Sequence, residues 1–288
     1  PAARAAVLLG RKHVALSNES SSDHATVLYR GRVINHQYGK SRALEAAMHR
    51  YLRAHVARDL HYFSLLRPFN ELQIAGRFSA LTAFHPIVRS CNRGRKTDTW
   101  CGRCPKCVST FVVLAAFLDR PALCGIFRKD LLLDPGCQAL LPALLGEEGT
   151  TRPFECVATP AELGAALALA RGERVSGEIL HVLTQRSEPH LVPPDLYAAA
   201  DAALRPRVQP LLGRAAVGVL GFGREGTSTA RHLISGNQTL DLTVLDDDPS
   251  VAARLPPAGH PSQRVRFAPV SDGSASPAID ILFKSPCV

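Results

Sequence analysis

The sequence predicts an α/β protein with two domains, and three patterns support this class. Short apolar strands run into polar loops and then into amphipathic helices in the first half. A cysteine-rich run follows between residues 91 and 107. A glycine-rich turn between a strand and a helix marks a second α/β pattern that opens at residue 214. We therefore predict a first domain over residues 1–187, a proline-rich linker over 188–213 and a partial Rossmann-like domain over 214–288.

The composition is that of a globular protein with an uneven charge. Of the 288 residues 46% are hydrophobic, and the net charge is +9. Residues 1–110 carry 18 Lys and Arg against 6 Asp and Glu, whereas the remainder is slightly acidic. This basic surplus indicates either a solvated face or a site for a polyanion such as a nucleotide, a sugar diphosphate or a nucleic acid. The apolar runs are too short to span a bilayer, so we expect no membrane partner.

Two strand ends in the first domain are rich in polar side chains. A predicted strand over residues 13–16 leads into the polar loop 17–22, and a strand at 33–34 leads into the loop 35–41. Ligands of parallel α/β sheets bind outside the carboxyl ends of the strands. Ser41 is a suitable N-cap for a helix whose apolar stripe includes Leu44, Met48, Leu52 and Val56.

Capping signals and apolar runs predict further helices in this domain. Asn70 can cap a helix over residues 71–81, and Arg67 is held extended because it precedes Pro68. Residues 108–118 are almost wholly apolar, which predicts a buried helix. Thr159 and Glu162 form a capping box for a helix that ends near residue 171, and a polar stretch follows to 187. The linker contains one Ala-rich helix over 195–204.

Four cysteines have the spacing of a metal site. Cys91, Cys101, Cys104 and Cys107 follow the pattern C-x9-C-x2-C-x2-C. Two overlapping C-x2-C steps place three thiolates on one turn, and the fourth can complete a tetrahedral shell. Zinc is favoured over an iron–sulfur cluster, and buried or disulfide-linked cysteines are the alternative. Thiolate ligands indicate a reducing compartment, so we expect a cytoplasmic protein.

The glycine-rich turn of the second domain predicts a nucleotide site. Gly221, Gly223 and Gly226 form G-x-G-x-x-G between a strand at 217–221 and a helix that ends near 235, and the next strand, 240–245, ends at Asp246. Such glycines let the backbone approach a diphosphate at the helix N-terminus. A turn that binds no ligand is the alternative. Only about three strands are recognisable, with the last at 281, so the domain looks cut short.

Residues 13–171 resemble the UDP-N-acetylmuramoyl-L-alanyl-L-glutamate epimerase family. The matching motifs are Ser17-Asn-Glu, Asn35-His-Gln-Tyr with Lys40-Ser41, Tyr62-Phe-Ser-Leu-Leu-Arg-Pro, Ser90-Cys-Asn, Trp100-Cys-Gly-Arg-Cys-Pro-Lys-Cys and Pro153-Phe-Glu-Cys. This family is similar to ATP-pyrophosphatase-like (adenine nucleotide alpha hydrolase-like) enzymes such as 7-cyano-7-deazaguanine synthase. The resemblance implies that residues 1–187 form the C-terminal part of such a domain with a zinc knot. The Ser-Gly-Gly-x-Asp-Ser loop that holds ATP in these enzymes would lie before Pro1.

Residues 214–288 look like the N-terminal domain of the muramoyl ligase that adds glutamate to UDP-N-acetylmuramoyl-L-alanine. The matching residues are Val219-Leu-Gly-Phe-Gly-Arg-Glu-Gly, Asp246 and Lys284-Ser-Pro, with Cys287 where the family has Gly. In that family this domain holds the UDP of the substrate. The resemblance therefore favours UDP over NAD and implies an epimerase–ligase fusion.

The implied activity is inversion of the terminal L-glutamate of UDP-N-acetylmuramoyl-L-alanyl-L-glutamate. ATP with Mg²⁺ would be the co-substrate, AMP and diphosphate would be released, and zinc would be structural. His36 suits a general base because imidazole titrates near neutral pH, and Lys40 could exchange protons or pair with an acyl phosphate. The expected substrate-binding residues are Asn35, Gln37, Tyr38, Ser41, Arg67 and Glu71, with Arg67 gripping a glutamate carboxylate. The expected nucleotide-binding residues are Gly221, Gly223, Arg224, Glu225, Gly226 and Asp246.

Two other classes of function fit parts of the sequence. A related ATP-dependent synthase would modify a nucleobase and would take a purine-like substrate. A non-enzymatic zinc module could bind nucleic acid through the basic surplus. Only 6% of residues are aromatic, and the basic residues do not interleave with stacking groups, so we expect no nucleic-acid partner.

Overall fold

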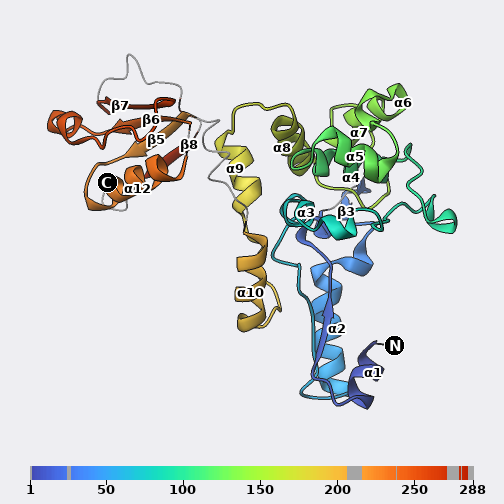
Figure 1. Cartoon of the computed structure of the whole chain (residues 1–288). Helices are drawn as coiled ribbons and strands as arrows, with labels where there is room; N and C mark the ends of the chain where they lie inside the picture. Colours follow the sequence, from blue (N-terminus) through green and yellow to red (C-terminus); the bar gives the residue numbers. More distant parts are fainter. Residues whose placement is uncertain are drawn as a thin grey trace. The chain divides into compact units, whose positions relative to one another are not determined.

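The computed structural model describes residues 2–24, 27–205, 216–237, 239–270, 279 and 281–284. The chain divides into two compact units (Figure 1). The first consists of the described residues within 1–170 and 184–206, and the second of those within 171–183 and 207–288. Both units contain parallel strands, which confirms the predicted α/β class. Residues 206–213 of the predicted linker, the predicted domain start at 214, the motif residues 285–286 and Cys287 lie outside the described residues.

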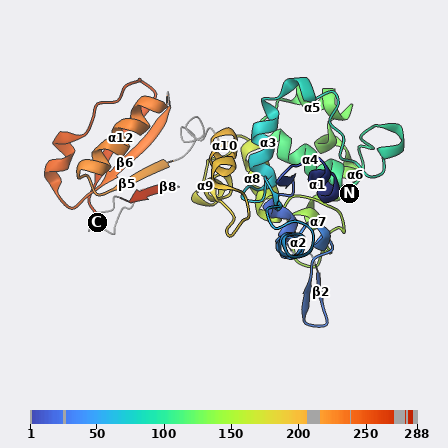
Figure 2. The same cartoon turned by 90° about the horizontal axis from the view of Figure 1, so that it is seen from below.

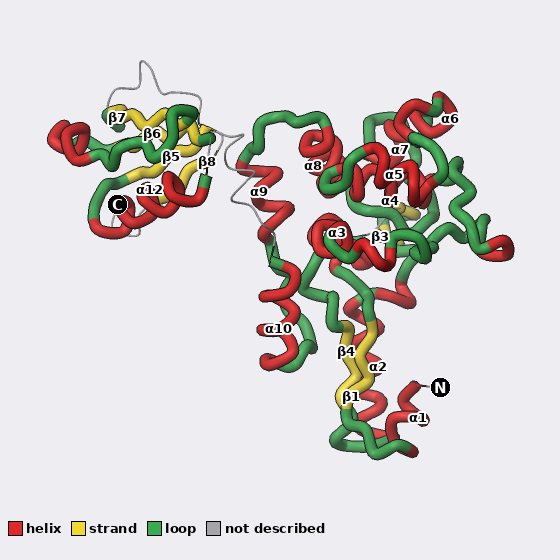
Figure 3. The backbone as a smooth tube through the Cα atoms, in the orientation of Figure 1, coloured by secondary structure: helices red, strands yellow, loops and turns green. Residues whose placement is uncertain are grey.

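A parallel strand pair with a helical crossover positions the polar loops of the first unit. Strands β1 (His13–Leu16) and β4 (His61–Ser64) pair in register from His13 opposite His61 to Leu16 opposite Ser64. Helix α2 (Arg42–His55) connects them and packs along β4 (Figure 3). Because the strands are parallel, the loops that follow Leu16 and Ser64 emerge at the same end.

A hairpin that the sequence did not predict interrupts this crossover. Strands β2 (Val27–Tyr29) and β3 (Arg32–Ile34) pair antiparallel and project from the rest of the unit (Figure 2). The turn places both Arg30 and Gly31 at positive φ. The short 3₁₀ helices η1 (Ser20–Asp23) and η2 (Tyr38–Lys40) flank the hairpin in the chain.

Local capping explains where α2 begins. Ser41 is the N-cap, as the sequence predicts, and its hydroxyl accepts a hydrogen bond from the Leu44 N–H. The apolar side of the helix contributes Leu52 to a small core with Val14 and Leu60. Helix α1 (Ala2–Leu8) closes this core through Ala6.

The main core of the first unit lies between helices. Helix α3 (Glu71–Ser79) has the predicted N-cap, Asn70, in a capping box with Gln73. It packs with α4 (Pro105–Ala115) and α8 (Pro160–Ala170). Helix α4 starts three residues earlier than predicted because Pro105 occupies its first turn, where a missing N–H costs nothing. Most residues of α4 are buried, as expected for an apolar helix.

Shorter helices complete the first unit. They are α5 (Arg120–Phe127), α6 (Pro135–Gln138), α7 (Leu141–Leu145) and α10 (Pro194–Leu204). Helix α10 confirms the Ala-rich helix predicted at 195–204. Helix α9 (Gly177–Thr184), which belongs almost wholly to the second unit, corrects the prediction of a polar stretch to residue 187. Val182 and Leu183 on that helix are buried, and such burial overrides the polar residues around them.

The second unit is a parallel sheet with the order β7-β6-β5-β8. Its strands are β5 (Ala216–Leu220), β6 (Leu240–Leu245), β7 (Gln263–Ala268) and β8 (Ile281–Lys284). Helix α12 (Arg224–Gly236) connects β5 to β6 and packs against both (Figure 1). Strand β7 was not predicted, because exposed Arg264 interrupts its apolar residues at the edge of the sheet.

No helix among the described residues is both long enough and apolar enough to cross a bilayer.

Candidate functional site

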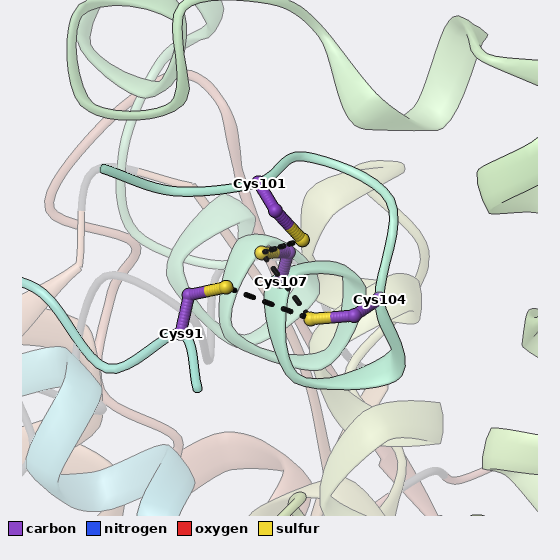
Figure 4. Close-up of side chains that lie close together, drawn as sticks. All are labelled: Cys91, Cys101, Cys104 and Cys107. Carbon is purple, nitrogen blue, oxygen red and sulfur yellow. Dashed lines mark hydrogen bonds between the residues drawn. The ribbon is translucent and has the colours of Figure 1, made fainter. Parts of the chain in front are cut away.

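The four cysteines of the predicted metal site come together in the structure (Figure 4). Their sulfur atoms all lie within 4.8 Å of one another, with the Cys91–Cys104, Cys101–Cys107 and Cys104–Cys107 distances at 3.8, 3.7 and 3.5 Å. A metal bound by four thiolates at about 2.3 Å requires sulfur atoms about 3.8 Å apart. The donor set therefore fits a tetrahedral S4 site.

Backbone features hold the cysteine cluster in this shape. The Gly94 N–H donates a hydrogen bond to the Cys91 sulfur at 3.2 Å, and a Cβ at Gly94 would overlap the carbonyl oxygen of Thr99. Trp100 is buried beside the cluster and packs on Phe127 with ring centroids 4.7 Å apart. Cysteine substitution at this cluster should therefore disturb the core around Trp100 as well as the metal site.

Three further cysteines, Cys124, Cys137 and Cys156, lie outside the cluster. The Cys137 thiol donates to the Gly102 carbonyl at 3.3 Å, which supports the turn at positive φ between two cluster residues. Cys156 belongs to a different part of the first unit, next to Lys40.

Arg67 organises the loops at the carboxyl ends of β1 and β4. Its side chain is 0% exposed, and it makes five hydrogen bonds inside the protein. Two go to the Glu45 carboxylate, and the others go to the Glu19 carbonyl, the Ser22 hydroxyl and the Lys40 carbonyl. A guanidinium has five N–H donors, so none is left for a ligand. The predicted grip of Arg67 on a substrate carboxylate does not fit this geometry.

The loop 35–41 is held by its own polar side chains. Asn35 donates to the Ser22 carbonyl at 2.9 Å and accepts from the Gln37 N–H at 2.8 Å. Gln37 is buried, and its Oε1 has no hydrogen-bond partner within the described part of the chain. Tyr38 is 57% exposed, so it is placed at the surface of this loop. The capping role of Ser41 is also structural.

His36 packs against the loop that follows residue 151. Its ring contacts Phe154 edge-on at 5.8 Å, and its Nε2 is buried. Burial lowers the pKa of His36, a hydrogen bond with the Glu155 backbone opposes this, and the nearby charges of Arg152 and Lys40 lower it further. The ring is therefore neutral at physiological pH and fixed between two loops.

Glu71 is the predicted substrate-binding residue whose pKa is clearly shifted. It is the first residue of α3, and its side chain is 22% exposed. Burial raises the pKa of Glu71 to about 7, and the negative charges of Glu162 and Glu19 add to this while Lys106 and Lys40 oppose it. The Lys106 ammonium lies 4.0 Å from the Glu71 carboxylate. A carboxyl group with this pKa can exchange protons near neutral pH.

The Glu162 carboxylate forms hydrogen bonds with three segments of the first unit, one of which contains Glu71. Its carboxylate accepts hydrogen bonds from the Ser21 hydroxyl, the Glu71 N–H and the Thr159 N–H at 2.7, 2.6 and 2.6 Å. The predicted capping box with Thr159 is present. Glu162 is only 1% exposed and lines a cavity of about 250 Å³ with Ser21 and His24. The carboxylate thus fixes the N-termini of α3 and α8 relative to the η1 loop.

Lys40 and Arg152 bring positive charge to the same region. The Lys40 ammonium donates a hydrogen bond to the Cys156 sulfur at 3.2 Å. Arg152 donates through Nη2 to the carbonyls of Val157 and Ala158, whereas its buried Nε and Nη1 have no partner among the described residues. Burial lowers the pKa of Arg152, while Glu162 and Glu71 raise it. Because both nitrogen atoms are buried, a ligand could reach them only if the loop 151–158 moved.

The fold brings to this region several residues for which the sequence predicted no ligand-binding role. They are Ser21, Lys106, Arg152, Cys156 and Glu162. Arg152 precedes the motif Pro153-Phe-Glu-Cys and Cys156 ends it, so this motif was the available signal. Lys106 lies between Cys104 and Cys107, and the cysteine spacing by itself does not indicate a role for the lysine charge. The approach of Lys106 to Glu71 depends on the packing of α3 on α4, and sequence alone does not specify it.

The glycine-rich turn of the second unit has the geometry of a tight strand-to-helix connection. Gly221 has φ +79°, and a Cβ at Gly226 would overlap the Gly221 carbonyl oxygen. Asp246 accepts hydrogen bonds from the N–H groups of Phe222 and Asp248 at 2.7 and 2.9 Å. Gly223 caps α12, and Arg224 and Glu225 form the first positions of that helix. Asp246 therefore shapes the loop through its two carboxylate oxygens.

Two family models match the first half of the chain. Residues 2–65 match the MurL N-terminal domain, and residues 87–192 match the MurL C-terminal domain. This part of the chain belongs to the MurL family. Both the loop with Lys40 and the cysteine cluster lie within the matched residues. No solved structure matches the chain significantly.

Three relatives are similar to between 54% and 67% of the chain, and each is named UDP-N-acetyl-alpha-D-muramoyl-L-alanyl-L-glutamate epimerase. The protein of Xanthomonas oryzae pv. oryzae is 36% identical over 200 residues, which cover 67% of this chain and 44% of the relative. The Salinispora tropica protein is 38% identical over 57% of this chain and 36% of the relative. The Micromonospora protein is 37% identical over 54% of this chain and 36% of the relative. The chain thus spans less than half the length of these MurL proteins.

Proposed function

We propose that the MurL part of the chain takes part in ATP-dependent inversion of the terminal L-glutamate of UDP-N-acetylmuramoyl-L-alanyl-L-glutamate. The names of the three relatives support this substrate and this reaction class. The observation that carries the proposal is that the segments of Lys40, Glu71 and Arg152 meet beyond the carboxyl ends of β1 and β4. Lys40 contacts Cys156 of the Arg152 segment, and the η1 loop hydrogen-bonds to both Lys40 and Glu71. These groups supply positive charge for an anionic substrate and a carboxyl group that exchanges protons near neutral pH.

The chemistry explains why ATP would be needed. A carboxylate resists loss of its α-proton, because the product would carry two adjacent negative charges. Transfer of an adenylyl group to the α-carboxylate, with loss of diphosphate, converts it into a mixed anhydride. Its α-proton can then be removed by a side-chain base. After inversion, water cleaves the anhydride and releases AMP. Mg²⁺ would accompany ATP and neutralise its phosphates.

The geometry suggests a different carboxylate-binding residue from the one predicted. Because Arg67 has no free donor, we assign the second carboxylate of the terminal glutamate to Arg152, whose Nε and Nη1 have no partner in the described part of the chain. Nη1 lies on the side of the guanidinium away from the Nε–H bond, so the two atoms would contact carboxylate oxygens separately. Because both atoms are buried, this contact requires movement of the loop 151–158. Asn35 and Gln37 then shape the neighbouring loop, and Lys40 faces the activated carboxyl. Tyr38 and Ser41 bind no substrate in this assignment.

His36 fits a positioning role better than the predicted role of general base. Its buried Nε2 and its contact with Phe154 place the ring between the loops 35–41 and 151–158. A buried nitrogen cannot reach the α-carbon of a substrate without movement of these loops. In this assignment His36 keeps the segment with Arg152 and Cys156 against the Lys40 loop.

The cysteine cluster is proposed to hold one structural zinc ion. Four thiolates leave no open coordination position, so the ion would act by fixing the segment before Trp100 to α4. The ATP-pyrophosphatase-like domain is likewise a proposal. It is supported by the parallel β1–β4 pair and by the polar loops at the carboxyl ends of these strands, where ligands of parallel α/β sheets bind.

The second unit is proposed to bind the uridine diphosphate end of a muramoyl peptide, as the N-terminal domain of a glutamate-adding muramoyl ligase would. The tight turn at Gly221 and the α12 N-terminus at Gly223 support a diphosphate site. Titration of the protein with UDP and with NAD separates this proposal from a dinucleotide site. Binding of NAD without binding of UDP would overturn it.

Epimerase activity can be tested with the protein expressed from its complete open reading frame. The dipeptide substrate is incubated with ATP and Mg²⁺, AMP is measured, and the glutamate released by acid hydrolysis is assigned as L or D. The proposal requires D-glutamate that depends on ATP. If no D-glutamate forms while a purine-like substrate drives AMP release, the nucleobase-modifying alternative replaces it.

A further inference from the structure

Inversion at a carbon atom needs one group that removes a proton from one face and a second group that delivers a proton to the other. This requirement follows from the proposed function, and the present inference rests on that function. His36, whose Nε2 is buried and whose ring is held between two loops, cannot serve both faces, so we look for two other proton carriers. Two suitable groups, a thiol and a carboxyl, belong to the segments that surround Lys40.

The first group is the thiol of Cys156. The Lys40 ammonium donates to its sulfur at 3.2 Å, and the side chain is half-buried, so a substrate can reach it. The position of Lys40 is itself fixed, because its carbonyl accepts hydrogen bonds from Arg67 and Ser22. An ammonium group beside a sulfur atom stabilises the negative charge that remains after the thiol gives up its proton.

The second group is the carboxyl of Glu71. It comes from α3, whereas Cys156 comes from the loop before α8, so the two approach from different elements. The charge of Lys40 acts on Glu71, and the Lys106 ammonium lies 4.0 Å from its carboxylate. Glu71 lies next to the Lys40 loop, because its N–H donates to the Ser21 hydroxyl while the adjacent Ser22 hydroxyl donates to the Lys40 carbonyl. Its side chain keeps part of its surface open to a ligand.

We propose that Glu71 and Cys156 are the two proton-transfer residues of the inversion, with the Lys40 ammonium hydrogen-bonded to the Cys156 sulfur. In the L-to-D direction, the Glu71 carboxylate takes the α-proton, and the electron pair of the broken C–H bond moves into the enolate of the activated carboxyl. The Cys156 thiol then gives its proton to the opposite face. The S–H bond breaks, a new C–H bond forms, and the sulfur is left as a thiolate beside Lys40. Proton exchange with water returns both groups to their starting forms.

The variant Cys156→Ser tests delivery of the proton. The protein from the complete open reading frame is incubated with the L-substrate and ATP in deuterium oxide. A hydroxyl is a much weaker acid than a thiol, so formation of the D-epimer should fall at least about 100-fold. AMP release should continue, and the recovered L-substrate should gain deuterium, because Glu71 still removes and returns a proton on its own face. The matched control is Cys124→Ser, at a half-buried cysteine of α5 outside the site, which should invert as the parent does.

The variant Glu71→Gln tests removal of the proton. It should release AMP but incorporate no deuterium into the L-substrate, whereas Cys156→Ser incorporates deuterium without inversion. If either variant forms the D-epimer at nearly the parental rate, the inference is overturned. It is also overturned if Cys156→Ser loses both AMP release and deuterium incorporation into the L-substrate. A parental protein that forms AMP but no D-epimer refutes the proposed function instead, so the two failures can be told apart.

Discussion

Replacement of Glu71 by glutamine should stabilise the first unit at neutral and alkaline pH. The folded-state pKa of Glu71 is raised from its ordinary value of 4.5 to about 7. The protonated carboxyl therefore contributes stability that is fully present below about pH 4.5 and is lost as the pH rises through about 7. A shift of this size corresponds to about 3 kcal/mol at most. Because 22% of the side chain is exposed and water screens its charge, we expect Glu71→Gln to raise the free energy of unfolding at alkaline pH by about 2 kcal/mol.

The single tryptophan offers an assay specific to the first unit. Trp100 is the only tryptophan in the sequence and is buried near the cysteine cluster, so its fluorescence reports unfolding of this unit. Urea denaturation of the parent and of Glu71→Gln is compared from pH 5 to pH 8.5. The variant should match the parent near pH 5 and become more stable with rising pH, while the exposed Glu148→Gln supplies the control. A stability difference that stays constant with pH, or that favours the parent as pH rises, would refute the electrostatic reasoning.

Three further predictions concern residues of known geometry. Cys104→Ser should lose one equivalent of zinc by elemental analysis while Cys124→Ser keeps it, and an iron-containing protein would contradict the assignment. Arg67→Ala should destabilise the first unit by about 3–5 kcal/mol in urea denaturation, because it leaves a buried carboxylate unpaired; a loss below 1 kcal/mol would count against this role. Gly226→Ala should weaken UDP binding at least about tenfold, because its Cβ overlaps a backbone oxygen and distorts the diphosphate loop. Gly259→Ala, at a glycine of the second unit outside the loop whose added Cβ would make only ordinary contacts of 3.6 Å, should bind UDP like the parent in calorimetric titration, and equal affinities for both variants would argue against the loop model.

Much of the local structure was determined by the sequence alone. The N-caps Ser41 and Asn70 and the capping box at Thr159 involve residues three apart, and such short-range bonds can be read from spacing. The cysteine cluster was predictable for the same reason, since three of its four members lie within seven residues. The glycine turn at 221–226 also depends only on local backbone geometry.

The contents of the candidate site were decided by the tertiary structure. Arg67 looks like a ligand-binding residue in the sequence, but packing buries it against Glu45, 22 residues away. Cys156 meets Lys40 across 116 residues, and Glu162 meets Ser21 across 141. The raised pKa of Glu71 depends on burial and on charges brought by four other segments. Desolvation and long-range charge contacts arise only when the helices pack, so no local pattern in the sequence encodes them.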